Sequence, residues 1–88
     1  MTANTSLREL RRTNLSLILA SLGGHGGQKK LSEKTGIHNS YISNLRVGNR
    51  EMGEEIARKI ETAMGLAVGW MDQPHSGIED DQVTFANT

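Results

Sequence analysis

The chain has 88 residues, which is enough for one small domain with a modest hydrophobic core. It contains no cysteine, so disulfides and thiolate metal sites are excluded and a reducing cytoplasm is the expected compartment. The sequence shows neither the apolar segment of a signal peptide nor an apolar run of membrane-spanning length, so we expect no membrane association.

The charges are unevenly distributed, although they sum to zero. All ten Lys and Arg residues lie between Arg8 and Lys59. Residues 1–71 therefore combine ten cations with six acids, a balance of +4, whereas residues 72–88 hold four acids, a balance of −4. A basic body with an acidic tail favours an anionic partner, which the net charge alone would not indicate.

The first predicted helix begins at SLRE (residues 6–9), a capping box in which the serine hydroxyl accepts a hydrogen bond from an amide of the first turn. Apolar residues then recur on one broad helical face up to the stop at residues 23–24. They are Leu7, Leu10, Leu15, Ile18 and Leu22. A second helix is predicted over residues 28–35, with Gly27 as its N-cap and Leu31 as its main apolar anchor.

Two further helices and a final turn follow. The third begins near Asn39 and ends at Gly48, and it turns three residues inward or partly inward: Tyr41, Ile42 and Leu45. The fourth begins after Gly53 and ends at Gly65. Its predicted buried stripe consists of Ile56, Ile60, Ala63 and Met64. Residues 66–71 form a last turn that packs on the rest, so the sequence predicts an all-α domain of four to five short helices.

The composition changes at residue 73, where Pro, His, Ser, Gly and acidic residues take over. We therefore divide the chain into a domain over residues 1–72 and an acidic tail over residues 73–88. In the tail, Val83 and Phe85 alternate with polar residues, which is a faint strand signal. The tail is expected to be either disordered or a short strand that joins two subunits.

Residues 28–47 read QKKLSEKTGIHNSYISNLRV, and their spacing is typical of a helix-turn-helix. Small Ser32 allows two helices to cross closely, and Gly36 stands where the chain must turn with positive φ. Apolar residues on both sides of the turn hold the two helices together. They are Leu31, Ile37, Ile42 and Leu45.

At these residues the chain resembles the Cro and lambda-repressor-like family of phage and bacterial regulators. Four stretches between about Arg11 and Asp72 carry the resemblance: RRTNL (residues 11–15), residues 28–47, GNR (residues 48–50) and ARKIETAMGLAVGWMD (residues 57–72). The second stretch is specific, and the other three support it. The resemblance implies a lambda-repressor-like bundle that contains a helix-turn-helix.

The resemblance also implies a recognition helix at residues 38–47, whose exposed side chains contact base edges in the major groove. The residues at these positions are His38, Asn39, Ser40, Ser43 and Asn44. Asparagine can bond to adenine through two atoms, and serine accepts either donor or acceptor edges. Such residues give little stability to a helix interior, which favours a role on the surface.

The stretch GGHGGQKK (residues 23–30) lacks both the preceding strand and the GK[ST] ending of a nucleotide-binding P-loop. The resemblance instead assigns the start of the second helix to the DNA backbone. The predicted phosphate contacts are Gln28, Lys29, Tyr41, Arg46 and Arg50. Arg11 and Arg12 are predicted to be surface charges of the first helix rather than contacts.

The sequence therefore predicts a sequence-specific, double-stranded DNA-binding transcriptional regulator, cytoplasmic in a bacterial or phage-infected cell and acting as a homodimer. The candidate dimer contacts are Trp70, Met71, Val83 and Phe85. The alternative is an antitoxin-like interaction module whose C-terminal tail binds a protein partner. No catalytic or metal-binding pattern is present, including among the three histidines, and we expect no enzyme activity, cofactor or small-molecule substrate.

Overall fold

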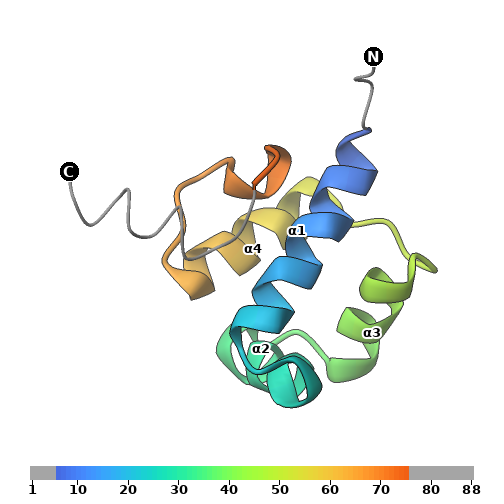
Figure 1. The fold of residues 1–88 in the computed structure, drawn as a ribbon, viewed down its shortest axis with the longest axis vertical. Coiled ribbons are helices and arrows are strands. Elements are labelled where there is room, and N and C mark those ends of the chain that lie inside the picture. Colours follow the sequence, from blue (N-terminus) through green and yellow to red (C-terminus); the bar gives the residue numbers. More distant parts are fainter. Residues whose placement is uncertain (1–5, 76–88) are drawn as a thin grey trace.

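The computed structural model describes residues 6–75 of the chain. These residues fold into four α-helices and two 3₁₀ turns, joined by short loops (Figure 1). The helices are α1 (Leu7–Ser21), α2 (Gly27–Thr35), α3 (Asn39–Val47) and α4 (Glu54–Met64), and the turns are η1 (Gly24–Gly26) and η2 (Trp70–Asp72). Within these residues there is no strand, so the predicted all-α bundle is confirmed. Val83 and Phe85 lie outside the described residues.

The helix ends follow the signals in the sequence. The Ser6 hydroxyl accepts a hydrogen bond of 3.1 Å from the amide of Glu9, which satisfies one unpaired donor of the first turn of α1. The three helices α2, α3 and α4 each end at a glycine in the left-handed region. The turn at Gly36, with φ of 79°, is the sharp bend that the sequence predicts between α2 and α3.

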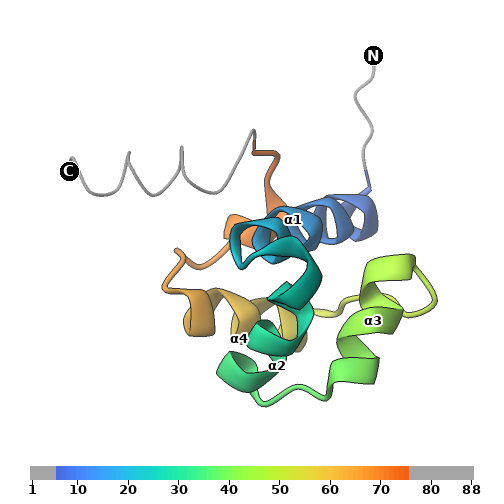
Figure 2. The same cartoon turned by 60° about the horizontal axis from the view of Figure 1, so that its bottom comes forward.

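The core lies where α1 packs against α2, α3 and η2 and where α4 packs against α2 and η2, and α3 is at one edge of the bundle (Figures 1 and 2). The fully buried aliphatic side chains of the core come from all four helices: Leu15, Ile18, Leu31, Ile42 and Ile60. Two details differ from the prediction. Leu7 is exposed because it lies in the first turn of α1, and α4 buries Ala57, Ile60 and Glu61 while Ile56, Ala63 and Met64 are only partly covered.

Gly27 has a different role from the predicted one. The N-cap of α2 is Gly26, and Gly27 is the first residue of the helix. A Cβ atom on Gly27 would lie 2.3 Å from the carbonyl oxygen of Leu19, a separation that no side chain can tolerate. A glycine at this position therefore lets the start of α2 touch the backbone of α1.

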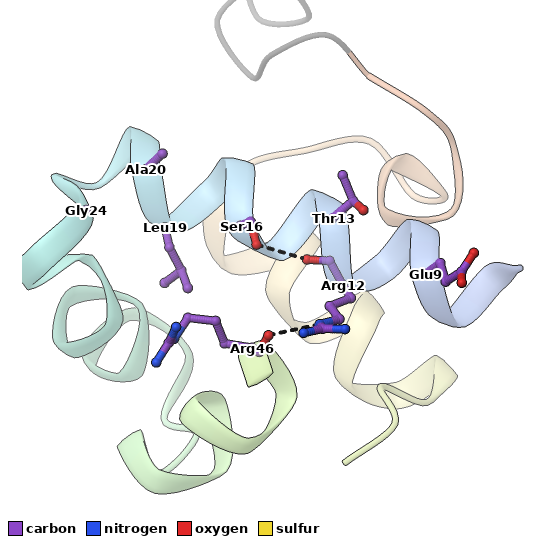
Figure 3. Close-up of a pocket in the computed structure, with 8 residues that line it drawn as sticks. All are labelled: Glu9, Arg12, Thr13, Ser16, Leu19, Ala20, Gly24 and Arg46. Atoms are coloured by element: carbon purple, nitrogen blue, oxygen red, sulfur yellow. Dashed lines mark hydrogen bonds between the residues drawn. The ribbon is translucent and has the colours of Figure 1, made fainter. Parts of the chain in front are cut away.

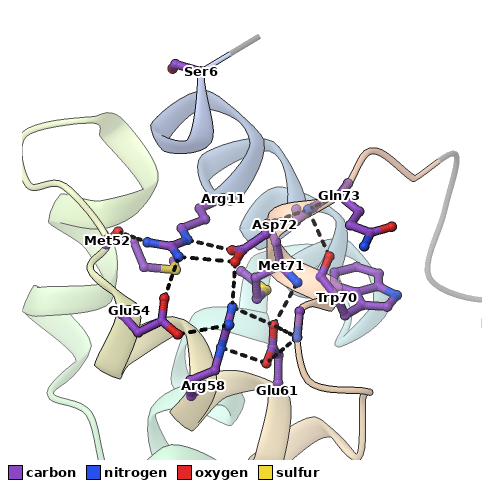
Figure 4. Close-up of polar contacts among 12 residues, drawn as sticks. Ser6, Arg11, Met52, Glu54, Arg58, Glu61, Trp70, Met71, Asp72 and Gln73 are labelled. Atoms are coloured by element: carbon purple, nitrogen blue, oxygen red, sulfur yellow. Dashed lines mark hydrogen bonds and ion pairs between the residues drawn. The ribbon is translucent and has the colours of Figure 1, made fainter.

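Arg11 is buried, which corrects its prediction as a surface charge. Its guanidinium donates to an Asp72 carboxylate oxygen at 2.7 Å, to the Met52 carbonyl at 3.0 Å and to Glu54 at 3.2 Å (Figure 4). The hydrogen bond from Arg11 is the main reason why the pKa of Asp72 lies below its ordinary value, and the same bond raises the pKa of Arg11. The first helix and the last turn are thereby tied together across the chain.

Two more buried polar side chains hold η2. Glu61, with 1% of its surface exposed, accepts hydrogen bonds from the amides of Gly69 and Met71 and pairs with Arg58. Asn14 donates through its side-chain amide to the Met71 carbonyl at 2.9 Å and to the Gln73 carbonyl at 2.8 Å. These bonds fix the short turn, which is otherwise too small to be stable alone.

Trp70 and Met71 are part of the core, with 4% and 0% of their surface exposed. This placement argues against their assignment as dimer contacts, because almost none of their surface is exposed within residues 6–75. The Trp70 ring also stacks on His75 at a centroid distance of 4.0 Å. In the same part of the chain, no helix has the length and apolar character needed to cross a bilayer.

Candidate nucleic-acid interface

The outward face of α3 carries four of the predicted base-contacting side chains. Asn39 and Ser40 are exposed, and Ser43 and Asn44 are half-buried at the edge of the same face. The opposite face of the helix is buried through Ile42 and Leu45. This division follows from the helical period, because residues three and four positions apart, such as Ser40 with Ser43 and Asn44, lie on the same side of a helix. The polar side chains are therefore exposed or half-buried and do not lie in the hydrophobic interior.

His38 forms the N-cap of α3. Its Nδ1 atom accepts a hydrogen bond of 3.1 Å from the amide of Ser40, and the Ser40 hydroxyl lies 2.8 Å from the same nitrogen. An accepting Nδ1 carries no proton, so the ring hydrogen is on Nε2 when the ring is neutral. The exposed imidazole thus caps α3 through Nδ1, and its Nε2 edge faces away from the helix.

Gln28 connects the start of α2 to both ends of α3. It accepts a hydrogen bond of 3.2 Å from Arg46 Nε, and its own amide nitrogen donates to Asn39 Oδ1 at 2.9 Å. Because an arginine can only donate, the atom that faces Arg46 is the Gln28 oxygen, and this fixes the orientation of both amides. Asn39 therefore directs its NH₂ group away from Gln28, while its oxygen retains a second lone pair. Three residues predicted separately, Gln28, Asn39 and Arg46, form one cluster.

The remaining predicted phosphate contacts flank this cluster. The Arg50 guanidinium lies over the ring of Tyr41, 4.5 Å from its centroid, which holds the loop after α3 against the helix. Lys29 is exposed at the start of α2 and lines a groove together with Gln28, Asn39 and Arg46. Cations therefore stand on both sides of the polar face of α3.

Two arginines of α1 hold the C-terminal end of α3, and sequence reasoning missed this role. Arg8 donates to the Gly48 carbonyl at 3.0 Å. Arg12 donates through Nε to the Arg46 carbonyl at 3.0 Å and through Nη2 to the Val47 carbonyl at 3.2 Å. The last carbonyls of a helix lack partners within the helix and attract cations. Both arginines are exposed, so Arg12 is a surface charge as predicted, but it also orients α3.

An open groove with a volume of about 630 Å³ runs along α1, and Arg46 of α3 forms part of its lining (Figure 3). Its lining residues are Glu9, Arg12, Thr13, Ser16, Leu19, Ala20, Gly24 and Arg46. A second groove of about 430 Å³ adjoins it, and the two share Leu19, Gly24 and Arg46. Within residues 6–75, no group of three His, Asp or Glu side chains is arranged to hold a metal ion.

Comparisons of the chain with protein-family models, with curated proteins and with solved structures give no match. The interpretation of the α3 surface therefore depends on its own residues and their geometry.

Proposed function

We propose that the chain is a sequence-specific, double-stranded DNA-binding transcriptional regulator, in which α2 and α3 form a helix-turn-helix. In this proposal α3 is the recognition helix. The observation that supports it most strongly is the outward face of α3, where Asn39, Ser40 and Asn44 stand together on a helix whose other face is buried. The resemblance of residues 28–47 to Cro and lambda-repressor-like regulators supports the same function.

The dimensions and chemistry of the helix suit the major groove. This groove is about 12 Å wide, and an α-helix with its side chains is about 10–12 Å across. In the proposed complex, Asn44 reads an adenine through its amide, and Ser40 and Ser43 accept or donate according to the base they face. The NH₂ group of Asn39, held by Gln28, supplies a donor in a fixed direction.

Contacts to the phosphates set the register of the helix on DNA and supply most of the salt-dependent affinity. We assign them to Gln28, Lys29, Arg46, Tyr41 and Arg50. Arg50 is held over the Tyr41 ring in the free protein, so little side-chain freedom is lost when it binds a phosphate.

The regulator acts as a homodimer in this proposal, because one recognition helix reads only a few base pairs. Two subunits on half-sites about 34 Å apart sum their contact energies. Since Trp70 and Met71 belong to the core, the dimer contacts are sought on other surfaces, with Val83 and Phe85 as the remaining candidates.

The test is the selection of binding sites from random duplex DNA by the full chain, followed by a salt titration of the affinity for the selected sequence. We expect a palindromic sequence that is bound at least about a thousandfold more tightly than random DNA. Selection without enrichment, or equal affinity for the selected and the random duplex, would show that the chain does not read DNA sequence.

A further inference from the structure

One face of α1 is exposed along most of the helix and borders the groove beside α3 (Figure 3). Its residues are Glu9, Arg12, Thr13, Ser16 and Ala20. Their spacing places them on one stripe of the helix. Beyond Arg12 the stripe contains only small side chains, two of them hydroxylic, so a large polar ligand can approach the helix closely along it.

Two arginines line the groove, Arg12 from α1 and Arg46 from α3. Within residues 6–75, Arg46 donates through Nε to Gln28, and this leaves the four hydrogens of its two terminal nitrogens for another acceptor. Arg12 uses Nε and Nη2 on the end of α3 and retains its Nη1 hydrogens. A guanidinium that is already positioned by neutral carbonyls keeps its full charge and suits the fork geometry of a phosphate.

The two adjoining grooves lead from Arg12 past Arg46 to Gln28, Lys29 and Asn39. Three cations line the two grooves, namely Arg12, Arg46 and Lys29. The one acid in the lining, Glu9, lies near the N-terminal end of α1. The path ends at Asn39, which belongs to the polar face of α3. A ligand with several anionic groups in a row matches this path better than a single small anion.

We propose that this α1–α3 groove is a phosphodiester-binding site, which takes the sugar-phosphate strand of DNA next to the major groove that α3 enters. The inference depends on the proposed function and adds to it a contact surface on α1. Arg12 and Arg46 bind the phosphate, and Thr13 donates its hydroxyl hydrogen to it. The Ser16 hydroxyl donates to the Arg12 carbonyl at 3.4 Å, so Ser16 presents its oxygen and small size to the strand and not a hydrogen. Glu9 excludes the strand from the far end of the groove.

The test changes the charge at Ser16 in both directions and measures the affinity of the full chain for a short random-sequence duplex at about 0.1 M salt. Ser16→Glu is expected to weaken binding roughly three- to tenfold, and Ser16→Lys to strengthen it by a similar factor, because the new charge lies next to a phosphate. Thr13→Glu repeats the test at a second position of the stripe. Both residues are exposed, and thermal unfolding checks that each variant folds.

The matched controls are Thr62→Glu and Thr62→Lys on α4, an exposed position outside both grooves. They are expected to change the affinity by less than about twofold, because salt screens charges beyond about 10 Å at moderate ionic strength. If the Ser16 and Thr13 variants change the affinity no more than the Thr62 variants do, the groove is not a phosphate site.

A second arm identifies the phosphate source. Replacing a fraction of the phosphates of the duplex by neutral methylphosphonates should reduce the penalty of Ser16→Glu, because the protein then meets fewer anions in every register on random DNA. Competition by inorganic phosphate equal to that by DNA would instead assign the groove to a free anion and overturn the proposal. These readouts use random DNA, so their failure is distinct from a failure of sequence reading by α3, which the selection experiment detects.

Discussion

Two regions of the molecule use polar side chains in opposite ways. Where α1, α4 and η2 meet, Arg11, Asn14 and Glu61 are buried and bond to groups of the protein itself. On the outward face of α3, Asn39 and Ser40 are exposed on a helix whose apolar residues already fill the core. The comparison shows that residue type alone does not identify a binding surface. Burial and the available partners decide whether a polar group serves the fold or a ligand.

The two regions should therefore respond differently to mutation. Removal of one partner from the buried cluster leaves other polar groups without hydrogen bonds, which is costly in a region that excludes water. Removal of a polar side chain from α3 breaks at most exposed hydrogen bonds and leaves no buried group without a partner, so its main effect is on what the surface can recognise. The experiments below are arranged from the largest expected effect to the smallest.

Glu61→Ala should have the largest effect, on stability. The change leaves the amides of Gly69 and Met71 without an acceptor and Arg58 without its buried partner. We expect the free energy of unfolding to fall by about 3 kcal/mol, measured by urea denaturation. Glu55→Ala, at an exposed position of the same helix, is the control and should stay within about 0.5 kcal/mol of the original chain. Equal effects of the two changes would show that the buried cluster does not hold the fold.

Acid should weaken the same region through Asp72. Its pKa in the folded chain is lowered, mainly because Arg11 donates hydrogen bonds to it, so the unfolded chain takes up the proton at a higher pH. The contribution of Asp72 is therefore fully present above the ordinary aspartate pKa of about 3.9, and it decreases as the pH falls through the lowered value. Unfolding free energies measured from about pH 7 downward should fall less steeply in Asp72→Asn than in the original chain. Parallel curves would contradict this coupling.

Arg50→Ala should have a smaller effect, which is confined to DNA binding. The change removes a cation held over Tyr41 but no buried group, so stability should hardly change. The affinity for the selected and the random duplex should fall by the same factor, and the slope of log affinity against log salt should decrease by about one. Lys59→Ala on α4 is the control cation. A loss restricted to the selected sequence would place Arg50 on a base instead.

Much of the architecture could be predicted because its signals are local. The Ser6 cap and the turn at Gly36 depend on residues within a few positions of each other, and the structure contains both. The inward positions of α3 were also predicted correctly, since Ile42 and Leu45 follow directly from the helical period. Local chemistry is sufficient for features of this kind.

The buried polar cluster was missed because its partners are distant in the chain. Arg11 donates a hydrogen bond to Asp72, 61 residues away, and no local sequence pattern predicts that contact. A signal was nevertheless present. Arg11 and Asn14 lie on the same helical face as Leu15 and Ile18, so the helical period directs their side chains toward the core. The bonds from Arg8 and Arg12 to the end of α3 had no such signal, because they depend on how two helices cross.

The most direct test of the central claim is the effect of Asn44→Ala on sequence preference. Within residues 6–75 no hydrogen bond engages the Asn44 side chain, and its main-chain carbonyl alone contributes to the end of α3. The fold should therefore tolerate the change. Affinity for the selected duplex should fall by roughly 1–3 kcal/mol while affinity for random DNA at the same salt concentration hardly changes. An unchanged preference for the selected sequence would contradict the assignment of α3 as the helix that reads DNA.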